Sequence, residues 1–321
     1  MNIVVTALLQ LEKFSSLTFN FMNMTNINDA PVLVVGATGF LGMEICSRLT
    51  ATNKKVKGLI RTGSDPVKIK ALQDMGVETI PGDVKDKSSL DEAMKGVATV
   101  ISTATSTISR QQGDSIETVD GTGQLNVVEA AKNAGVKHFV FISFHSMPQE
   151  FPLQTAKRNA ELALIESGMA YTILQPTMFM EMWLSPIVGF NYPDAKATIY
   201  GDGKNKLCWV SREDVAALAV ASLNNPAALN RVFEIGGPEP LSPLEVVQIF
   251  EQCSGNAFSV EHVPVEALLA QKNNAPDSLS QSFTSLMIAY AEEKLIPMEE
   301  TLQVLPVQLK SVKEYAASVS Q

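Results

Sequence analysis

The sequence predicts an α/β protein built on a doubly wound parallel sheet. From Pro31 onward, short apolar runs rich in Val and Ile alternate with segments of helical periodicity. Nearly continuous apolar runs are typical of strands covered on both faces, and regular alternation with helices favours a parallel sheet. Glycines close several helical segments just before the next strand, as is common at helix C-termini. Together these three observations predict the fold class.

The order of the elements follows from the same pattern. Strands are expected at Val32–Val35, Val56–Ile60, Val77–Ile80, Thr99–Ser102, His138–Ser143 and Tyr171–Leu174. Helices are expected between them at Phe40–Ala51, Asp65–Met75, Lys87–Met94, Asp114–Asn133 and Leu153–Ser167. The glycines that mark helix ends are Gly76, Gly96, Gly135 and Gly168.

The pattern loosens after Pro176. Thr198–Val210 reads as short extended segments, and Ser211 caps a helix because Asp214 follows three residues later, before an apolar run. Val232–Ile235 is another strand, and Phe258–Val263 is a short strand within a region of mostly helical pattern. We expect this part of the chain to form a small C-terminal α/β lobe over the carboxyl edge of the sheet.

Composition excludes several classes of protein. The 321-residue chain is 45% hydrophobic and has a net charge of −9 with no basic block, which argues against nucleic-acid binding. Its three cysteines are far apart and its three histidines lack ligand spacing, so we expect no disulfide framework, no metal site and a reducing, cytoplasmic location. No segment reaches the ~18 consecutive apolar residues of a membrane span.

The most specific motif is a strand that runs straight into three glycines. Gly36, Gly39 and Gly42 follow Val32–Val35 at the start of a predicted helix. In a dinucleotide site the first glycine permits the tight turn, the second admits the pyrophosphate and the third lets the helix pack on its strand. The helix N-terminus adds N–H groups and a positive dipole end. The motif predicts a Rossmann-type dinucleotide site rather than a turn without a ligand. Further contacts expected in this turn are Thr38, Phe40 and Leu41.

The end of the second strand indicates which nucleotide binds. An NAD site usually places Asp or Glu there for the ribose hydroxyl, but this strand ends in Arg61 and Thr62, with no acidic residue before Asp65. The guanidinium of Arg61 suits a 2′-phosphate, and either Thr62 or Ser64 would add a hydroxyl. We therefore predict NADP over NAD, although Arg61 as a solvated surface residue is the alternative.

Two further strand ends carry predicted cofactor contacts. Asp83 and Val84 follow the third strand, where a carboxylate suits the adenine amino group; capping of the next helix is the alternative role for Asp83. Thr103 and Ala104 follow the fourth strand, where small residues let the backbone approach the cofactor. We accordingly divide the chain into a disordered extension (1–30), an NADP-binding Rossmann domain (31–176) and a mixed segment (177–321) that completes the sheet and forms the small substrate lobe.

Four stretches of the sequence resemble one known family. These stretches are Gly36–Gly42, Gly82–Val84, Gly135–Ser143 and Tyr171–Met180. They are similar to the NmrA-like branch of the atypical short-chain dehydrogenase/reductase proteins, and the resemblance covers roughly Pro31 to Gly255. It implies an NADP-binding Rossmann domain with a small C-terminal substrate lobe. Members of the family divide between reductases, including isoflavone-reductase-like enzymes, and redox-sensing regulators.

The resemblance also shows where this chain departs from the wider superfamily. Ordinary members use Tyr-x-x-x-Lys, with the tyrosine as proton donor and the lysine holding the nicotinamide ribose. Lys157 matches the lysine, but Leu153 occupies the tyrosine position. Lys157 is expected to contact the cofactor and to be one candidate proton donor; the alternative is a surface lysine. His145, which follows the fifth strand, is the other candidate donor. Ser143 lies one residue before the usual position of the substrate-orienting hydroxyl.

The loop after the sixth strand completes the predicted site. In the family this loop lies beside the nicotinamide, and the matching residues here are Gln175, Pro176, Thr177 and Phe179. Neighbouring apolar side chains such as Phe144, Met178 and Trp183 would line a site for a flat, largely apolar substrate; packing in the core is the alternative role for at least half of them. The first functional hypothesis is an NADPH-dependent reductase of a carbonyl, enone or quinone. The alternatives are a non-catalytic NADP(H) sensor or an assembly factor that acts through a protein partner.

Overall fold

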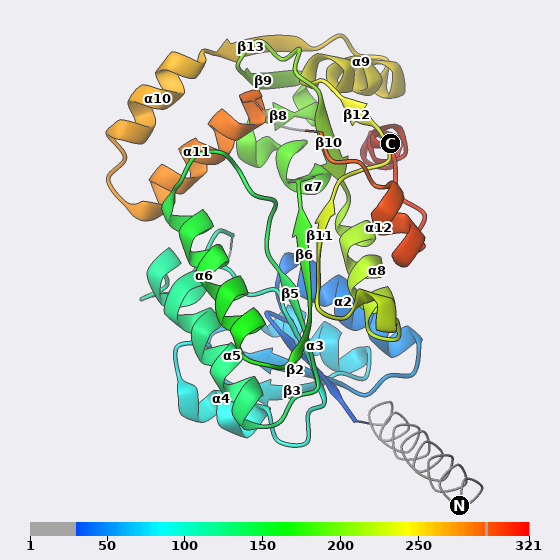
Figure 1. Ribbon diagram of the computed structural model, residues 1–321. Coiled ribbons are helices and arrows are strands. Elements are labelled where there is room, and N and C mark those ends of the chain that lie inside the picture. Colours follow the sequence, from blue (N-terminus) through cyan, green and yellow to red (C-terminus); the bar gives the residue numbers. More distant parts are fainter. Residues whose placement is uncertain (1–29, 109, 293–294, 321) are drawn as a thin grey trace, which may run out of the picture.

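A seven-stranded parallel sheet forms the centre of the molecule (Figure 1). The structure is a computed structural model that describes residues 30–320 except 109 and 293–294, so nearly all of the predicted extension, 1–30, lies outside the described residues. The strand order is β11-β6-β5-β4-β1-β2-β3, and every pairing is parallel. The strands are β1 (Val32–Val35), β2 (Val56–Ile60), β3 (Glu78–Pro81), β4 (Thr99–Ser102), β5 (His138–Ile142), β6 (Ala170–Pro176) and β11 (Arg231–Ile235). The predicted fold class is confirmed.

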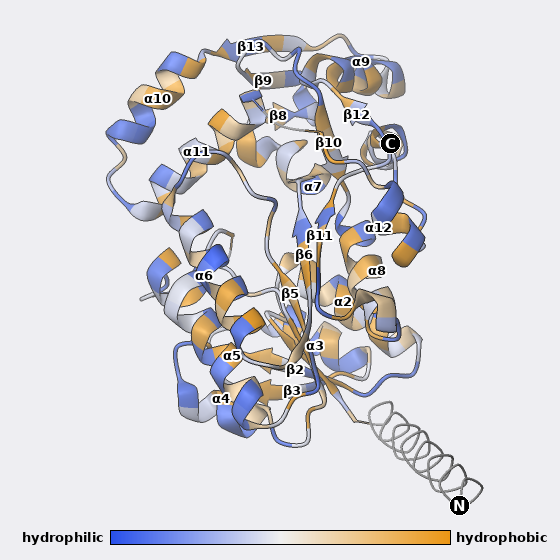
Figure 2. Cartoon of the chain, in the orientation of Figure 1, coloured by the Kyte–Doolittle hydropathy of each residue, from blue (hydrophilic) through white to orange (hydrophobic). Residues whose placement is uncertain are grey.

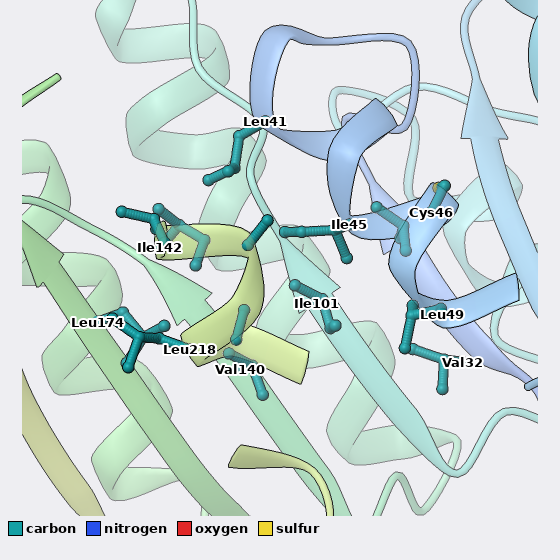
Figure 3. Packing of buried hydrophobic residues seen from close by; sticks show 14 of the residues in the cluster. Val32, Leu41, Ile45, Cys46, Leu49, Ile101, Val140, Ile142, Leu174 and Leu218 are labelled. Atoms are coloured by element: carbon teal, nitrogen blue, oxygen red, sulfur yellow. The ribbon is translucent and has the colours of Figure 1, made fainter. Parts of the chain in front are cut away.

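Helices cover both faces of this sheet and enclose two separate cores. One face carries α2 (Phe40–Ala51), α3 (Pro66–Asp74) and α8 (Arg212–Ser222), and the other carries α4 (Lys87–Ala93), α5 (Gln124–Asn133) and α6 (Pro152–Glu166). Val32 and Val34 point into the first core and Leu33 and Val35 into the second, as the period of a strand requires. Figure 3 shows Ile45 and Leu49 of α2 and Leu218 of α8 in the first core, and Figure 2 shows that the central strands are apolar.

One predicted helix is irregular. The segment expected at Asp114–Asn133 begins as a π-helical segment, η1 (Ile116–Gly123), and continues as α5. Gly123 lets η1 pack closely against Val84. A Cβ at this position would lie 2.7 Å from a Val84 methyl and 2.8 Å from the Thr118 carbonyl oxygen. π-helical segments occur frequently at functional sites, so the side chains that η1 directs toward the sheet are of interest.

The C-terminal lobe lies beyond the carboxyl ends of the strands (Figure 1). It contains two small sheets, of strand order β12-β10-β7 and β13-β9-β8, and a core of its own around Trp209, Phe250 and Tyr290. Its elements are β7 (Met178–Phe179), α7 (Met180–Trp183), η2 (Pro186–Val188), β8 (Phe190–Asn191), η3 (Tyr192–Asp194), β9 (Lys196–Tyr200), β10 (Leu207–Val210), β12 (Pro240–Leu241), α9 (Pro243–Ser254), β13 (Ser259–Val263), α10 (Val265–Asn273), α11 (Ser278–Glu292) and α13 (Val312–Val319). Two further elements, η4 (Pro226–Ala228) and α12 (Glu299–Val304), pack instead against the first core of the main sheet. The same stretch of chain returns to the main sheet as β11, which pairs with β6.

The topology places the candidate site at one edge. The strand order changes direction between β1 and β4, and ligands of open α/β sheets bind outside the carboxyl ends of strands at such a switch point. The predicted glycine turn follows β1, and other predicted contacts follow β2, β3, β4 and β5 or lie on α6. Gln175 and Pro176, expected in the loop after the sixth strand, are instead the last residues of β6, which is longer than predicted. None of the helices in the described ranges is long and apolar enough to cross a membrane.

Candidate functional site

The turn between β1 and α2 requires glycine at all three predicted positions. Gly36 has a φ of +86°, and a Cβ there would lie 2.7 Å from the Thr103 hydroxyl. A Cβ on Gly39 would lie 2.9 Å from the Gly36 carbonyl oxygen, and one on Gly42 only 2.1 Å from the same oxygen. Real Cβ atoms do not approach backbone so closely, so these glycines keep the turn tight and its main chain bare.

The N-terminus of α2 is suited to an anion. Gly39 is the N-cap residue and supplies no side-chain acceptor to the first turn, which also contains no acidic residue. The first amides of the helix and its positive dipole end therefore face the carboxyl edge without a competing side chain. This is the arrangement that binds a diphosphate in dinucleotide sites. Predicted contacts Thr38 and Phe40 lie in this turn, whereas the side chain of Leu41 is buried in the core.

The segment after β4 lies directly beside the glycine turn. Thr103 donates a hydrogen bond from its hydroxyl to the Val35 carbonyl oxygen (3.1 Å). The Ala104 carbonyl oxygen accepts from the Gln124 side chain (2.7 Å). A Cβ on Gly36 would also lie 3.0 Å from the Ala104 nitrogen. The structure thus brings the predicted contacts from β1 and β4 together at the switch point.

Arg61, at the end of β2, is paired with an acid that sequence analysis did not find. Its Nη1 forms an ion pair with Asp114, and Lys85 pairs with the other oxygen of the same carboxylate. Asp114 lies 53 residues from Arg61 in the sequence, so no local motif signalled the contact. Burial raises the pKa of Asp114, but the bonds from Lys85, Gln111 and Arg61 outweigh it, and the pKa lies below its ordinary value. The interpretation of Arg61 as a merely solvated residue is wrong.

Of the two predicted contacts after β3, Asp83 lies beside Lys85 and Val84 lies in the core. The alternative role for Asp83, capping the next helix, is wrong because Asp86 is the N-cap of α4. Asp83 instead accepts from the backbone of Lys85 (2.9 Å) and lies 3.6 Å from its ammonium group. Val84 is buried in the core beside η1, and Thr62 after β2 is exposed. A role of Asp83 toward adenine stays a prediction.

Lys157 is buried, so the alternative of a surface lysine is wrong. Only 5% of the residue is exposed, and its Nζ lies 3.3 Å from Oδ1 of Asp120 and 5.2 Å from the centre of the Phe141 ring. Asp120, on η1, is fixed in turn because its Oδ2 accepts from the backbone nitrogen (2.9 Å) and hydroxyl (2.7 Å) of Ser106. The π-helical segment therefore delivers a buried carboxylate to the one buried lysine of α6.

A second charged network connects two other predicted contacts. Arg158 donates from Nη2 to the Ser143 hydroxyl (3.2 Å) and to the Phe144 carbonyl oxygen, and its Nη1 lies 3.1 Å from Glu161. Gln175 donates to the same Glu161 carboxylate (3.0 Å). Burial lowers the pKa of Arg158. Ser143 and Gln175 stay predicted contacts, and the sequence did not indicate the Arg158–Glu161 pair to which both bond.

The loop after β6 is tightly held. Thr177 donates from its nitrogen to Ile235 (2.9 Å) and from its hydroxyl to Cys208 (2.6 Å). The Pro176 carbonyl oxygen accepts from the backbone of His145 (3.2 Å), whose side chain is buried. Phe179 then packs edge-on against Phe40 with ring centres 5.7 Å apart, which joins this loop to the glycine turn.

The fold and this edge together define a dinucleotide-binding protein of the Rossmann type. Leu153, in the position of the tyrosine, packs in an apolar cluster with Phe151 and Met147, so the departure from Tyr-x-x-x-Lys is real in three dimensions. The chain belongs to the NmrA-like family, whose model matches residues 28–316. The resemblance noted in the sequence is confirmed.

The chain is similar both to a protein named as a reductase homolog and to one named as an assembly factor. The chain is 31% identical over 273 residues to isoflavone reductase homolog IRL of Zea mays, covering 78% of this chain and 82% of that protein. It is 28% identical over 240 residues to photosystem II assembly factor Ycf39 of Trieres chinensis, covering 73% of this chain and 72% of that protein.

Solved structures share the fold over most of the chain. The NADPH complex of quinone oxidoreductase QOR2 from Escherichia coli has a TM-score of 0.74 at 21% identity and covers 90% of this chain and 100% of that one. AtPrR2 with NADP+ and (+)pinoresinol has a TM-score of 0.73 at 26% identity and covers 90% of this chain and 98% of that one. The NADP+ bound in the second structure agrees with the prediction of NADP.

Proposed function

We propose that this protein binds NADP(H) and is an NADPH-dependent reductase of a small, largely apolar carbonyl, enone or quinone compound. Family membership, a relative named as an isoflavone reductase homolog and the geometry of the carboxyl edge support the proposal. The observation that carries it is the buried Lys157–Asp120 pair beside the ends of β4 and β5. Burying two charges is costly, and buried ionic groups with specific partners concentrate at functional sites.

The residues present fit the cofactor from end to end. The amides of α2 and the bare backbone at Gly36 and Gly39 would hold the diphosphate, and Arg61 would face the 2′-phosphate. Lys157 and the loop after β6 would hold the nicotinamide half. When bound, NADPH supplies a hydride, and the protein supplies orientation and a dry, charged environment.

Reduction of a carbonyl or quinone by a hydride also requires a proton for the substrate oxygen. Since Leu153 cannot donate one, Lys157 is the candidate donor, with its ammonium group oriented by Asp120 and Phe141. His145, buried in the loop after β5, stays the second candidate. The alcohol or hydroquinone oxygen would take the proton, and the lysine would recover it from solvent.

A second function has a specific observation in its favour. Some relatives are photosystem II assembly factors by name, and α6 of this chain lacks the tyrosine that ordinary reductases of the superfamily use. An NADP(H)-binding sensor or assembly factor acting through a protein partner is therefore the alternative. The cytoplasmic location, the domain boundaries and the assignment of site residues remain predictions.

Turnover separates the two functions. Purified full-length protein should oxidise NADPH in the presence of at least one member of a panel of quinones, enones and aldehydes, and NADPH deuterated at C4 should slow the reaction. Lys157→Met should abolish this activity, whereas Lys87→Met, which removes an exposed ion pair with Glu129, should not. NADPH binding without turnover across the panel would favour the sensor or assembly factor.

A further inference from the structure

Two cations at the ends of β2 and β3 share one buried acid. Arg61 and Lys85 bind opposite oxygens of Asp114, whose side chain is fully buried, whereas the two cations remain 22% and 28% exposed. The backbone nitrogen of Gln111 also donates to Asp114 Oδ2 (2.8 Å), which ties the carboxylate to its own turn. The carboxylate is therefore enclosed by protein, and the cations form the surface above it.

This arrangement bears on which nucleotide can bind. An acid at the end of β2 normally selects NAD because it accepts from the ribose 2′-hydroxyl. Asp114 cannot serve in that way, because it is buried and already accepts from three donors. Within the described residues, Arg61 bonds to Asp114 through Nη1. The edge of the guanidinium formed by Nε and Nη2 can therefore make the bidentate contact that arginine forms with phosphate.

We propose that Asp114 is a positioning residue for the 2′-phosphate of NADP(H), which fixes Arg61 and Lys85 side by side as a two-cation cradle. The proposal rests on the NADP(H) site of the proposed function but not on reduction. Asp83, 3.6 Å from Lys85, is the other acid at this cradle. The two acids together balance the two cations, so the cradle can be assembled before the phosphate arrives without uncompensated repulsion.

The charge of Asp114 is what the cradle requires. In an Asp114→Asn variant the amide NH2 would face one of the two cations, so the side chain could accept from only one of them. Arg61 and Lys85 would then repel each other and lose their common anchor. Binding of a 2′-phosphate should weaken, while contacts made by the rest of the nucleotide should be spared.

Adenosine 2′,5′-bisphosphate and adenosine 5′-monophosphate test this directly, because they differ only in the 2′-phosphate. By calorimetric titration of the full chain, wild-type protein should bind the bisphosphate more tightly. Asp114→Asn should weaken the bisphosphate by about tenfold, as expected for lost charge-assisted bonds, and the monophosphate by less than about twofold. Lys85→Met should cause a smaller loss with the same selectivity, and Asp114→Glu should recover part of the affinity.

The controls make each outcome decisive. Lys87→Met removes a nearby exposed lysine and should change neither affinity. Equal losses for both nucleotides, or unchanged or tighter bisphosphate binding in Asp114→Asn and Lys85→Met, would overturn the proposal. If Asp114→Asn does not fold, Lys85→Met decides by the same criterion. Selective loss in a protein that never turns over NADPH would leave the cradle intact and remove the reductase function.

Discussion

The two ends of the candidate site are built by different means. At the diphosphate end, three glycines within seven residues keep the backbone bare. A Cβ on Gly39 or Gly42 would meet the Gly36 carbonyl oxygen, and one on Gly36 would meet the Thr103 hydroxyl. At the nicotinamide end, buried charges are held by partners from other elements, such as Asp120 on η1 for Lys157. The glycine turn therefore tolerates no added side-chain atom. The nicotinamide end depends instead on a balance of buried charges, so substitution of one charged side chain changes the balance without closing the site.

The largest effect should come from adding one methyl group to the glycine turn. A Cβ in Gly42→Ala would lie 2.1 Å from the Gly36 carbonyl oxygen, so α2 must shift. We expect a loss of about 3 kcal/mol in the free energy of unfolding and loss of NADPH binding. Gly76→Ala is the matched control: it has a φ of +85° but open space around its Cβ. It should cost about 1 to 2 kcal/mol and leave NADPH affinity unchanged. Equal NADPH affinities in the two variants would break the comparison.

Removing the buried cation should test the side-chain end. Lys157→Met leaves Asp120 buried and unpaired, so we expect a loss of about 3 kcal/mol in unfolding free energy together with weaker NADPH binding. Adding Asp120→Asn should recover part of the stability, since the uncompensated charge is gone, but none of the NADPH affinity. Thermal or urea unfolding with parallel NADPH titrations separates the two effects. Recovery of affinity in the double variant would show that Lys157 has only a structural role.

The amino end of β5 provides a pH-dependent contrast far from the site. Burial lowers the pKa of His138 from 6.5 to about 4, and its Nε2 bonds to the Thr172 hydroxyl (2.9 Å). The unfolded chain binds the proton more readily than the folded protein does. The stability that the neutral, buried His138 contributes is therefore complete above pH 6.5, and it is lost as the pH falls through 4. At 1.36 kcal/mol per pKa unit the loss is about 3 kcal/mol at most. In His138→Gln the free energy of unfolding should fall less steeply between pH 6.5 and pH 4, and NADPH affinity should not change. An unaltered pH slope would contradict this assignment.

The smallest effect should come from the contact that joins the two ends. Phe179→Leu keeps an apolar side chain but removes the edge-on contact with Phe40, which we expect to cost about 1 kcal/mol. NADPH affinity should fall by only a few fold, since neither the glycine turn nor the Lys157 pair is altered. A loss as large as that of Gly42→Ala would mean that the loop after β6, not the glycine turn, dominates binding.

The same contrast explains what could be predicted from the sequence. The glycine turn, the bounds of β1, β2, β4 and α2, and the cap at Ser211 depend on neighbours within a few residues, and the structure reproduces them. Asp114 and Asp120 were missed because each meets its partners only after the sheet has formed. No local feature of the sequence indicated that the helix expected over Asp114–Asn133 would begin with a π-helical segment. That segment places Asp120 beside Lys157.

Calorimetric titration of the purified full-length chain with NADPH and NADH tests the central claim most directly. The bare turn at Gly36–Gly42 and the guanidinium of Arg61 predict saturable binding of NADPH, tighter than that of NADH by at least about tenfold. No binding of either nucleotide, or tighter binding of NADH, would contradict the account.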